Sequence, residues 1–94
     1  MKVDKIKSYI GFAIKSKSII FGLDTIKEKK VNLIVYANSM SESSKKSIKI
    51  ISEKQKCPCY EIQDDEMLNL TNQEKIKAFG IMNIELAKAI INNM

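Results

Sequence analysis

Apolar residues occur with two different spacings, which alternate along the chain. Spacings of three and four, typical of helices with one buried face, predict helices over residues 3–16, from residue 23, over 42–55, over 65–70 and after residue 83. Between them lie short, nearly continuous apolar runs, which are typical of strands covered on both faces. These runs predict strands over residues 18–21, 31–37, 59–62 and 77–82.

Start and stop signals support these boundaries. Gly22 ends the first strand, because glycine weakens a strand and suits a turn. Ser39 and Glu42 have the spacing of a capping box ahead of the third helix. Asp64 and Asn83 are the expected caps of the fourth and fifth helices.

Strands that alternate with helices need crossover connections, which place helices on both faces of a sheet. We therefore predict an α/β fold, a three-layer α/β/α sandwich with a mixed four-stranded sheet, formed by a single domain over residues 1–94. Its third helix should bury Ser44, Ile48 and Ile51 and turn the lysines at 45, 46 and 49 toward water.

Charge is unevenly placed along the sequence. All 16 basic residues are lysines, and residues 1–56 carry a net charge of +8 whereas residues 57–94 carry −3. Such polarity indicates an anionic partner on one side of the molecule. Lysine is a point charge without the planar fork of arginine, so phosphate contact is the use we expect. The competing interpretation is a solvated face that reflects compositional bias.

Most catalytic chemistries lack the residues they need. Histidine is absent, so a serine or cysteine nucleophile has no ordinary base, and Gly22 belongs to no phosphate-loop motif. Cys57 and Cys59 are too close for a normal disulfide and wrongly spaced for zinc. The carboxylates at 64–66 could hold a hard cation, but we expect them to stabilise the positive end of a helix. We predict no enzyme, metal or cofactor.

The sequence also points away from membranes. No apolar run approaches the ~20 residues of a membrane span, and the N-terminal residues alternate lysine with apolar positions instead of forming a secretory signal. The two closely spaced cysteines give no disulfide framework of a secreted protein. We therefore expect a cytoplasmic monomer without a membrane partner.

The stretch around Gly22 is the candidate anion site. A strand that ends at a glycine beside a helix start frees backbone amides, which suits a phosphate or an unpaired base. The missing Cβ lets a nucleotide approach the main chain. Aromatic residues are few and scattered, so an irregular RNA recognised by shape fits better than an extended strand. The residues alone leave RNA binding and an unassigned small α/β module both open.

Three segments together resemble a known family. They are GFAIKSKSIIFGLDTIK (residues 11–27), VNLIVYANS (31–39) and LNLTNQEKIKAFGIM (68–82). Taken together they resemble the ribosomal-protein family that binds kink-turn RNA, which includes the large-subunit proteins seven-Ae and thirty-e. The chain is most similar to the family's small bacterial, ribosome-associated members. The resemblance implies the same α/β/α sandwich and a non-enzymatic protein whose partner is a kink-turn or ribosomal RNA, or the ribosome.

The resemblance also implies where the RNA binds. The family's RNA surface is the glycine turn after the first strand, the helix that follows, and the loop before the last strand. On this chain these regions hold Gly22, Leu23, Asp24, Thr25, Lys27, Leu70, Thr71 and Asn72. From their charge and their place in the sequence, we add Lys15 and Lys17 to the predicted contact surface.

The turn departs from the family pattern G-x-N-E-x-x-K. Asp24 stands where asparagine is usual, Thr25 where glutamate is usual and Glu28 where lysine is usual, and Lys27 comes one place early. An ionised aspartate only accepts hydrogen bonds, whereas asparagine also donates them. Carboxylates at 24 and 28 would repel RNA phosphates. The alternative hypothesis is therefore a protein–protein interaction module that kept the fold and lost kink-turn binding.

Overall fold

Nine regular elements alternate along the computed structural model, which describes residues 1–94. They are α1 (Val3–Lys15), β1 (Ile19–Phe21), α2 (Leu23–Glu28), β2 (Leu33–Ala37), α3 (Glu42–Gln55), β3 (Cys59–Ile62), α4 (Asp64–Thr71), β4 (Ala78–Ile81) and α5 (Ile84–Ile91). Order and type agree with the predicted elements. The strand expected from residue 31 begins two residues later, because Val31 donates its N–H to a glutamine side chain and not to a neighbouring strand.

The four strands form one mixed sheet in the order β1-β4-β2-β3. β2 and β3 are parallel, as the crossover through α3 requires. β4 lies between β1 and β2 and is antiparallel to both. The predicted mixed four-stranded sheet is confirmed.

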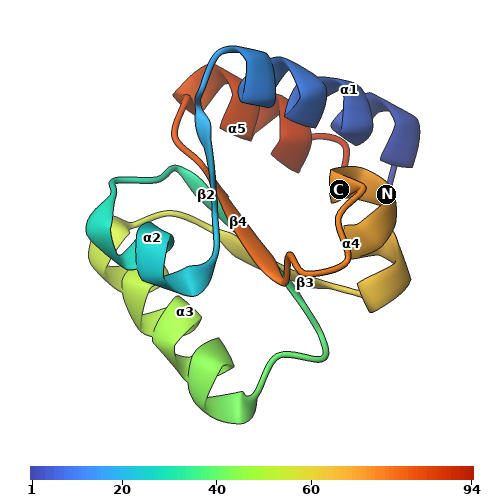
Figure 1. Cartoon of the computed structure of the whole chain (residues 1–94). Helices are drawn as coiled ribbons and strands as arrows, with labels where there is room; N and C mark the ends of the chain where they lie inside the picture. Colours follow the sequence, from blue (N-terminus) through green and yellow to red (C-terminus); the bar gives the residue numbers. More distant parts are fainter.

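Helices cover both faces of this sheet (Figure 1). α1, α4 and α5 pack on one face around a cluster of 15 buried apolar residues. α2 and α3 cover the other face over a cluster of seven. The predicted three-layer α/β/α sandwich is therefore confirmed. No helix of the structure is both long and apolar enough to cross a membrane.

The burial of β2 on both faces explains why its sequence is continuously apolar. All five of its residues are buried. Leu33, Val35 and Ala37 face the larger cluster, whereas Ile34 and Tyr36 face the smaller one. Because successive side chains of a strand point to opposite faces, a central strand between two helical layers needs an apolar residue at every position.

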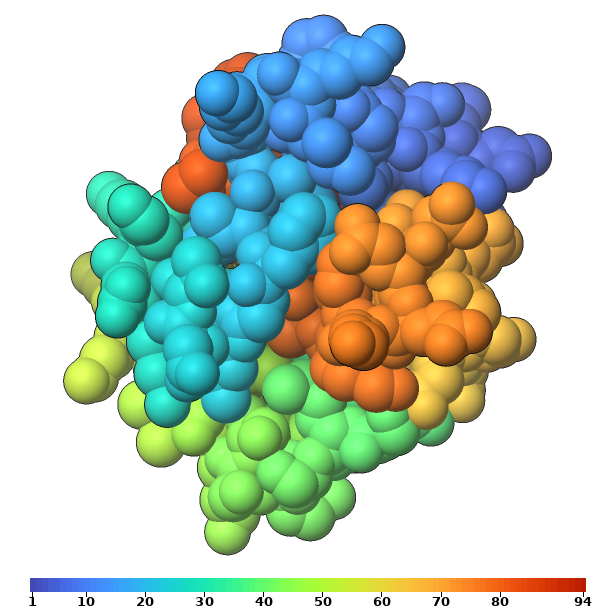
Figure 2. Space-filling model, in the orientation of Figure 1, coloured from blue at the N-terminus to red at the C-terminus, as the bar shows by residue number.

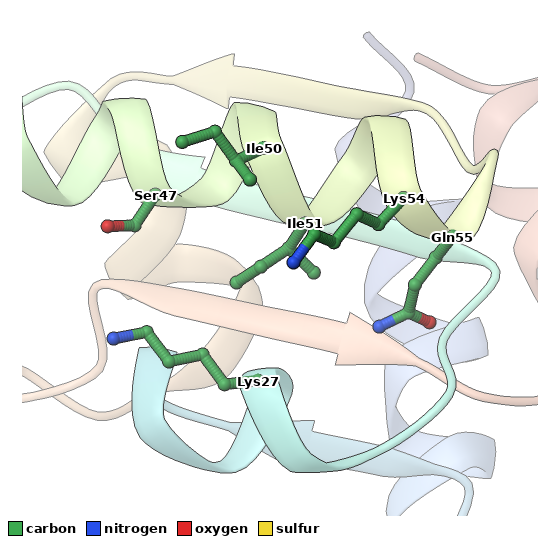
Figure 3. A pocket seen from close by; sticks show the side chains of 6 residues that line it. All are labelled: Lys27, Ser47, Ile50, Ile51, Lys54 and Gln55. Atoms are coloured by element: carbon green, nitrogen blue, oxygen red, sulfur yellow. The ribbon is translucent and has the colours of Figure 1, made fainter.

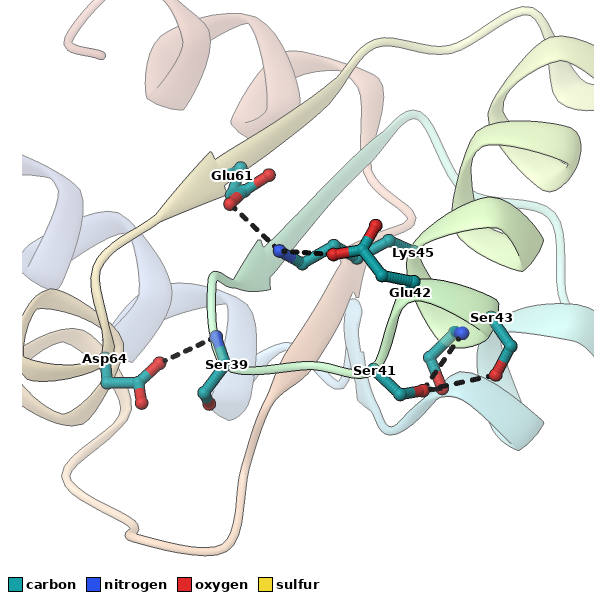
Figure 4. Close-up of polar contacts among 8 residues, drawn as sticks. Ser39, Ser41, Glu42, Ser43, Lys45, Glu61 and Asp64 are labelled. Carbon is teal, nitrogen blue, oxygen red and sulfur yellow. Dashed lines mark hydrogen bonds and ion pairs between the residues drawn. The ribbon is translucent and has the colours of Figure 1, made fainter.

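Two of the three predicted helix caps were wrong by one or two residues. The Ser41 side chain, not that of Ser39, accepts the Ser44 N–H at 3.2 Å and starts α3 (Figure 4). Gln63, not Asp64, caps α4, in a reciprocal capping box with Glu66. The polar run at each helix start offers several possible acceptors, and only the path of the chain selects one. Asn83 is confirmed, since its Oδ1 accepts the N–H groups of two residues of α5.

Lys45 is a further correction. We expected its side chain in water, but it is only 14% exposed and lies 3.3 Å from Glu61 Oε2 and 3.8 Å from Glu42 Oε1 (Figure 4). β3 brings Glu61 to the start of α3, and this placement has no signal in the α3 sequence. Burial, and then the Glu61 carboxylate, raise the pKa of the neighbouring Tyr36 above its usual value.

Candidate functional site

The turn from β1 into α2 is built on Gly22. Its backbone has φ of 90° and ψ of 147°, a conformation that is essentially restricted to glycine. The Gly22 N–H donates to Ala78 O at 3.0 Å, which ties the turn to the start of β4. The residue is exposed, and no atom outside Gly22 and its two chain neighbours lies within 4 Å of the place where a Cβ would sit. The main chain is therefore open to a partner here.

The first turn of α2 leaves backbone donors without acceptors. Gly22 has no side chain that could cap the helix, and its carbonyl accepts only the Ile26 N–H. The amides of Leu23, Asp24 and Thr25 donate to no atom of the protein. Asp24 and Thr25 are exposed, and Leu23 packs partly against the smaller core cluster.

The loop before β4 lies beside this turn. β1 pairs with β4, with Phe21 opposite Phe79, so the loop that precedes Ala78 enters the sheet next to Gly22. In Figure 2 the blue segment of β1 and the turn adjoin the orange segment that precedes β4. Asn72 is exposed in this loop and has a left-handed backbone with φ of 58°. The end of this loop, where it enters β4, is thus next to the glycine turn.

Leu70 and Thr71 belong to the last turn of α4 and not to the loop. Both side chains are buried. The Thr71 hydroxyl lies 2.9 Å from Met67 O and 3.3 Å from Gln73 O, within hydrogen-bond reach of each, and it accepts the Gln73 N–H at 3.4 Å. These residues shape and support the loop, and among the three loop positions predicted only Asn72 offers an exposed side chain.

The three predicted lysines are not gathered around Gly22. Lys15 ends α1 and Lys17 follows it with φ of 57°, so both precede β1, whereas Gly22 follows it. Ser18 and the three residues of β1 lie between Lys17 and Gly22, a span of at most about 16 Å. Lys27 lies in the last turn of α2 and faces α3. The lysines therefore flank the turn from different sides.

No lysine neutralises the carboxylates of the turn. None of the three ion pairs in the structure involves Asp24 or Glu28, and both residues are exposed. Asp24 lies in the first turn of α2, where the partial positive charge of the helix end stabilises an anion. This arrangement gives Asp24 a structural role that does not need a ligand.

The acidic run at the start of α4 is also structural. Asp64 Oδ1 accepts the Ser39 N–H at 3.3 Å (Figure 4), and Glu66 Oε1 accepts the Gln63 N–H at 2.9 Å. Hydrogen bonds from Ser39, with a smaller effect of Lys77, lower the pKa of Asp64. No group of three or more potential ligand side chains could hold a metal. Cys57 and Cys59 are unpaired thiols, and burial raises the pKa of Cys57.

The face of α3 that is turned toward α2 carries none of the predicted site residues, although it meets Lys27 of α2. Ser47, Ile50, Ile51 and Lys54 follow one another at helical spacing and line a cleft toward α2. We expected Ile51 in the core with Ile48, yet Ile51 is only partly buried and Ile50 is 55% exposed. The exposed isoleucine in a lysine-rich helix is the only local signal that could have identified this face.

Comparisons with known proteins agree with the fold. No family model matches the chain. The RNA-binding protein YlxQ of Enterococcus faecium is 28% identical over 88 residues, which cover 89% of this chain and 85% of that protein. A solved structure of a protein with unknown function from Bacillus halodurans superposes with a TM-score of 0.77 at 12% identity, with 94% of each chain covered. This structural likeness shows a shared fold.

Proposed function

We propose that this chain is a non-enzymatic RNA-binding protein that docks an irregular RNA on the β1–α2 turn and the loop before β4. The observation that carries the proposal is the exposed, side-chain-free Gly22 beside three amides without acceptors. The similarity to a protein named for RNA binding supports the same class of function. The family resemblance extends the proposal to kink-turn RNA, ribosome association and the bacterial cytoplasm.

Each part of the surface has a chemical role in this proposal. Gly22 lets a nucleotide reach the main chain, and the amides of residues 23–25 donate to phosphate or base oxygens. The Asn72 side chain both donates and accepts, so it can hydrogen-bond to a base edge. Lys15, Lys17 and Lys27 attract the backbone from the flanks of the turn.

A direct titration tests the function. A kink-turn RNA and a straight duplex of equal length are titrated in matched salt, and the bent RNA should bind more tightly because shape selects the turn. With about three phosphate contacts, log affinity should fall against log salt with a slope of about −2 to −3. Equal affinity for the bent RNA and the straight duplex would contradict the proposal that the protein recognises kink-turn RNA. An RNA affinity that does not change with salt concentration would contradict the proposed contacts between lysines and phosphates.

Asp24→Asn should strengthen RNA binding. The substitution removes a negative charge and adds an amide donor at an exposed position of the turn. Two like charges at ~4 Å repel by about 1 kcal/mol in water, so the gain should be about fivefold. Fluorescence anisotropy with the kink-turn RNA measures it. Asp4→Asn, in the first turn of α1, is the matched control and should leave affinity unchanged.

A protein–protein interaction module is the second candidate function. The exposed, unpaired carboxylates of Asp24 and Glu28 favour it, because they lie on the surface that RNA phosphates would approach. A pull-down with and without ribonuclease separates the two functions. Partners that survive nuclease treatment and include no ribosomal component would favour the protein module.

A further inference from the structure

An open cleft lies between α2 and α3, away from the Gly22 turn. Its volume is about 330 Å³, and its lining consists of Lys27 from α2 and of Ser47, Ile50, Ile51, Lys54 and Gln55 from α3. Figure 3 shows Lys27 on one wall and the other five side chains on the opposite wall. The two isoleucines supply an aliphatic surface, and the two lysines supply the charge.

Both cleft lysines are available to an anion. No carboxylate lines the cleft, and neither Lys27 nor Lys54 takes part in any of the three ion pairs. The surrounding segment, residues 27–56, holds eight lysines against three glutamates, a net charge of +5. The rest of the chain holds eight lysines and eight carboxylates. The whole net charge of the protein is thus concentrated in the segment that includes both walls of the cleft.

Gln55 holds the two walls of the cleft together. Its Oε1 accepts the Val31 N–H at 2.6 Å, and its Nε2 donates to Lys29 O at 2.9 Å. These bonds fasten the segment that follows α2 to the last turn of α3. The cleft therefore exists before any ligand arrives, and a ligand does not have to order its walls.

We infer that the proposed RNA contact extends beyond the turn into this cleft, where Lys54 binds a backbone phosphate together with Lys27, which the proposed surface already includes. The inference rests on the proposed RNA-binding function. α2 begins at the Gly22 turn, and its six residues span about 9 Å, so a strand docked at the turn reaches the cleft along α2. Lysine contacts phosphate as a point charge, and the isoleucines offer an apolar surface to the sugar carbons.

The salt dependence of RNA binding tests this site. Lys54→Gln should make the slope of log affinity against log salt shallower by about one, and the double variant Lys27→Gln/Lys54→Gln by about two. Lys88→Gln is the matched control, since Lys88 is also an exposed lysine in the last turn of a helix but lies on the other face of the sheet. It should leave the slope unchanged. Ile50→Glu, which adds a negative charge to the lining, should also weaken binding.

The outcomes separate this inference from the proposed function. A wild-type protein that binds neither RNA overturns both. A wild-type protein that binds kink-turn RNA, with Lys54→Gln indistinguishable from Lys88→Gln, overturns the cleft site alone. A labelled poly-glutamate peptide that binds the wild type but not Lys54→Gln, with RNA affinity unchanged, would also overturn it and assign the cleft to an acidic protein segment.

Discussion

Phe79→Ala should lower the free energy of unfolding by about 3–5 kcal/mol. Phe79 is fully buried at the centre of the sheet, where it pairs with Phe21 of β1 and Val35 of β2 and belongs to the larger core cluster. Truncation loses the transfer free energy of the ring and leaves a cavity. A domain of this length has a total stability of about 5–14 kcal/mol, so the variant should be close to unfolding.

Urea denaturation of Phe79→Ala beside Phe12→Ala measures this effect. Phe12 is 60% exposed on α1, so its removal should change stability by no more than about 0.5 kcal/mol. The comparison removes the same atoms from a buried and an exposed site. A loss below about 1 kcal/mol at residue 79 would contradict the position of this side chain between the two neighbouring strands.

Gly22→Ala should destabilise the protein by about 1–3 kcal/mol, although there is open space for the added methyl group. The cost comes from the backbone, because an L-residue at φ of 90° and ψ of 147° is strained. The strain acts where the turn is held to β4 through the bond from Gly22 N–H to Ala78 O. Relief of the strain would shift the amides of the turn, so RNA binding should weaken as well.

Gly11→Ala is the matched control, and its effect should have the opposite sign. Gly11 lies inside α1, and a Cβ there would also meet no atom within 4 Å. Because alanine is the better helix former, the variant should gain about 0.5–1 kcal/mol. Denaturation midpoints of the two variants report the difference. A neutral Gly22→Ala would show that the turn tolerates an ordinary side chain and would weaken the case for close approach of RNA.

The candidate site could be predicted from sequence only in its backbone part. Gly22 ends β1 and starts α2 as expected, since a glycine after an apolar run is a local signal. The positions of the lysines in space could not be predicted from local sequence signals. Lys15 and Lys17 are near Gly22 in the chain, but an intervening strand carries them to its other end. Lys54 is 32 positions from Gly22, and only the packing of α3 against α2 brings it to the end of α2.

The path of the chain into two helices and one ion pair explain the other differences between expectation and structure. Several serines and acidic residues precede α3 and α4, and each can accept a helix N–H, so the caps depend on how the chain enters the helix. Lys45 is drawn into a pair with Glu61 by the parallel pairing of β2 and β3. Lys45 and Glu61 lie 16 positions apart, too far in sequence for their pairing to leave a periodic signal.

The sequence by itself determined the order of helices and strands, the two covered faces of the sheet and the glycine turn, because periodicity and turn chemistry act over a few neighbouring residues. Only the tertiary structure decided that β4 inserts between β1 and β2, which places the start of β4 beside Gly22. It also decided that the positive charge lines the cleft between α2 and α3. Strand order and helix packing depend on contacts between residues far apart in the chain, and a single sequence carries no local record of them.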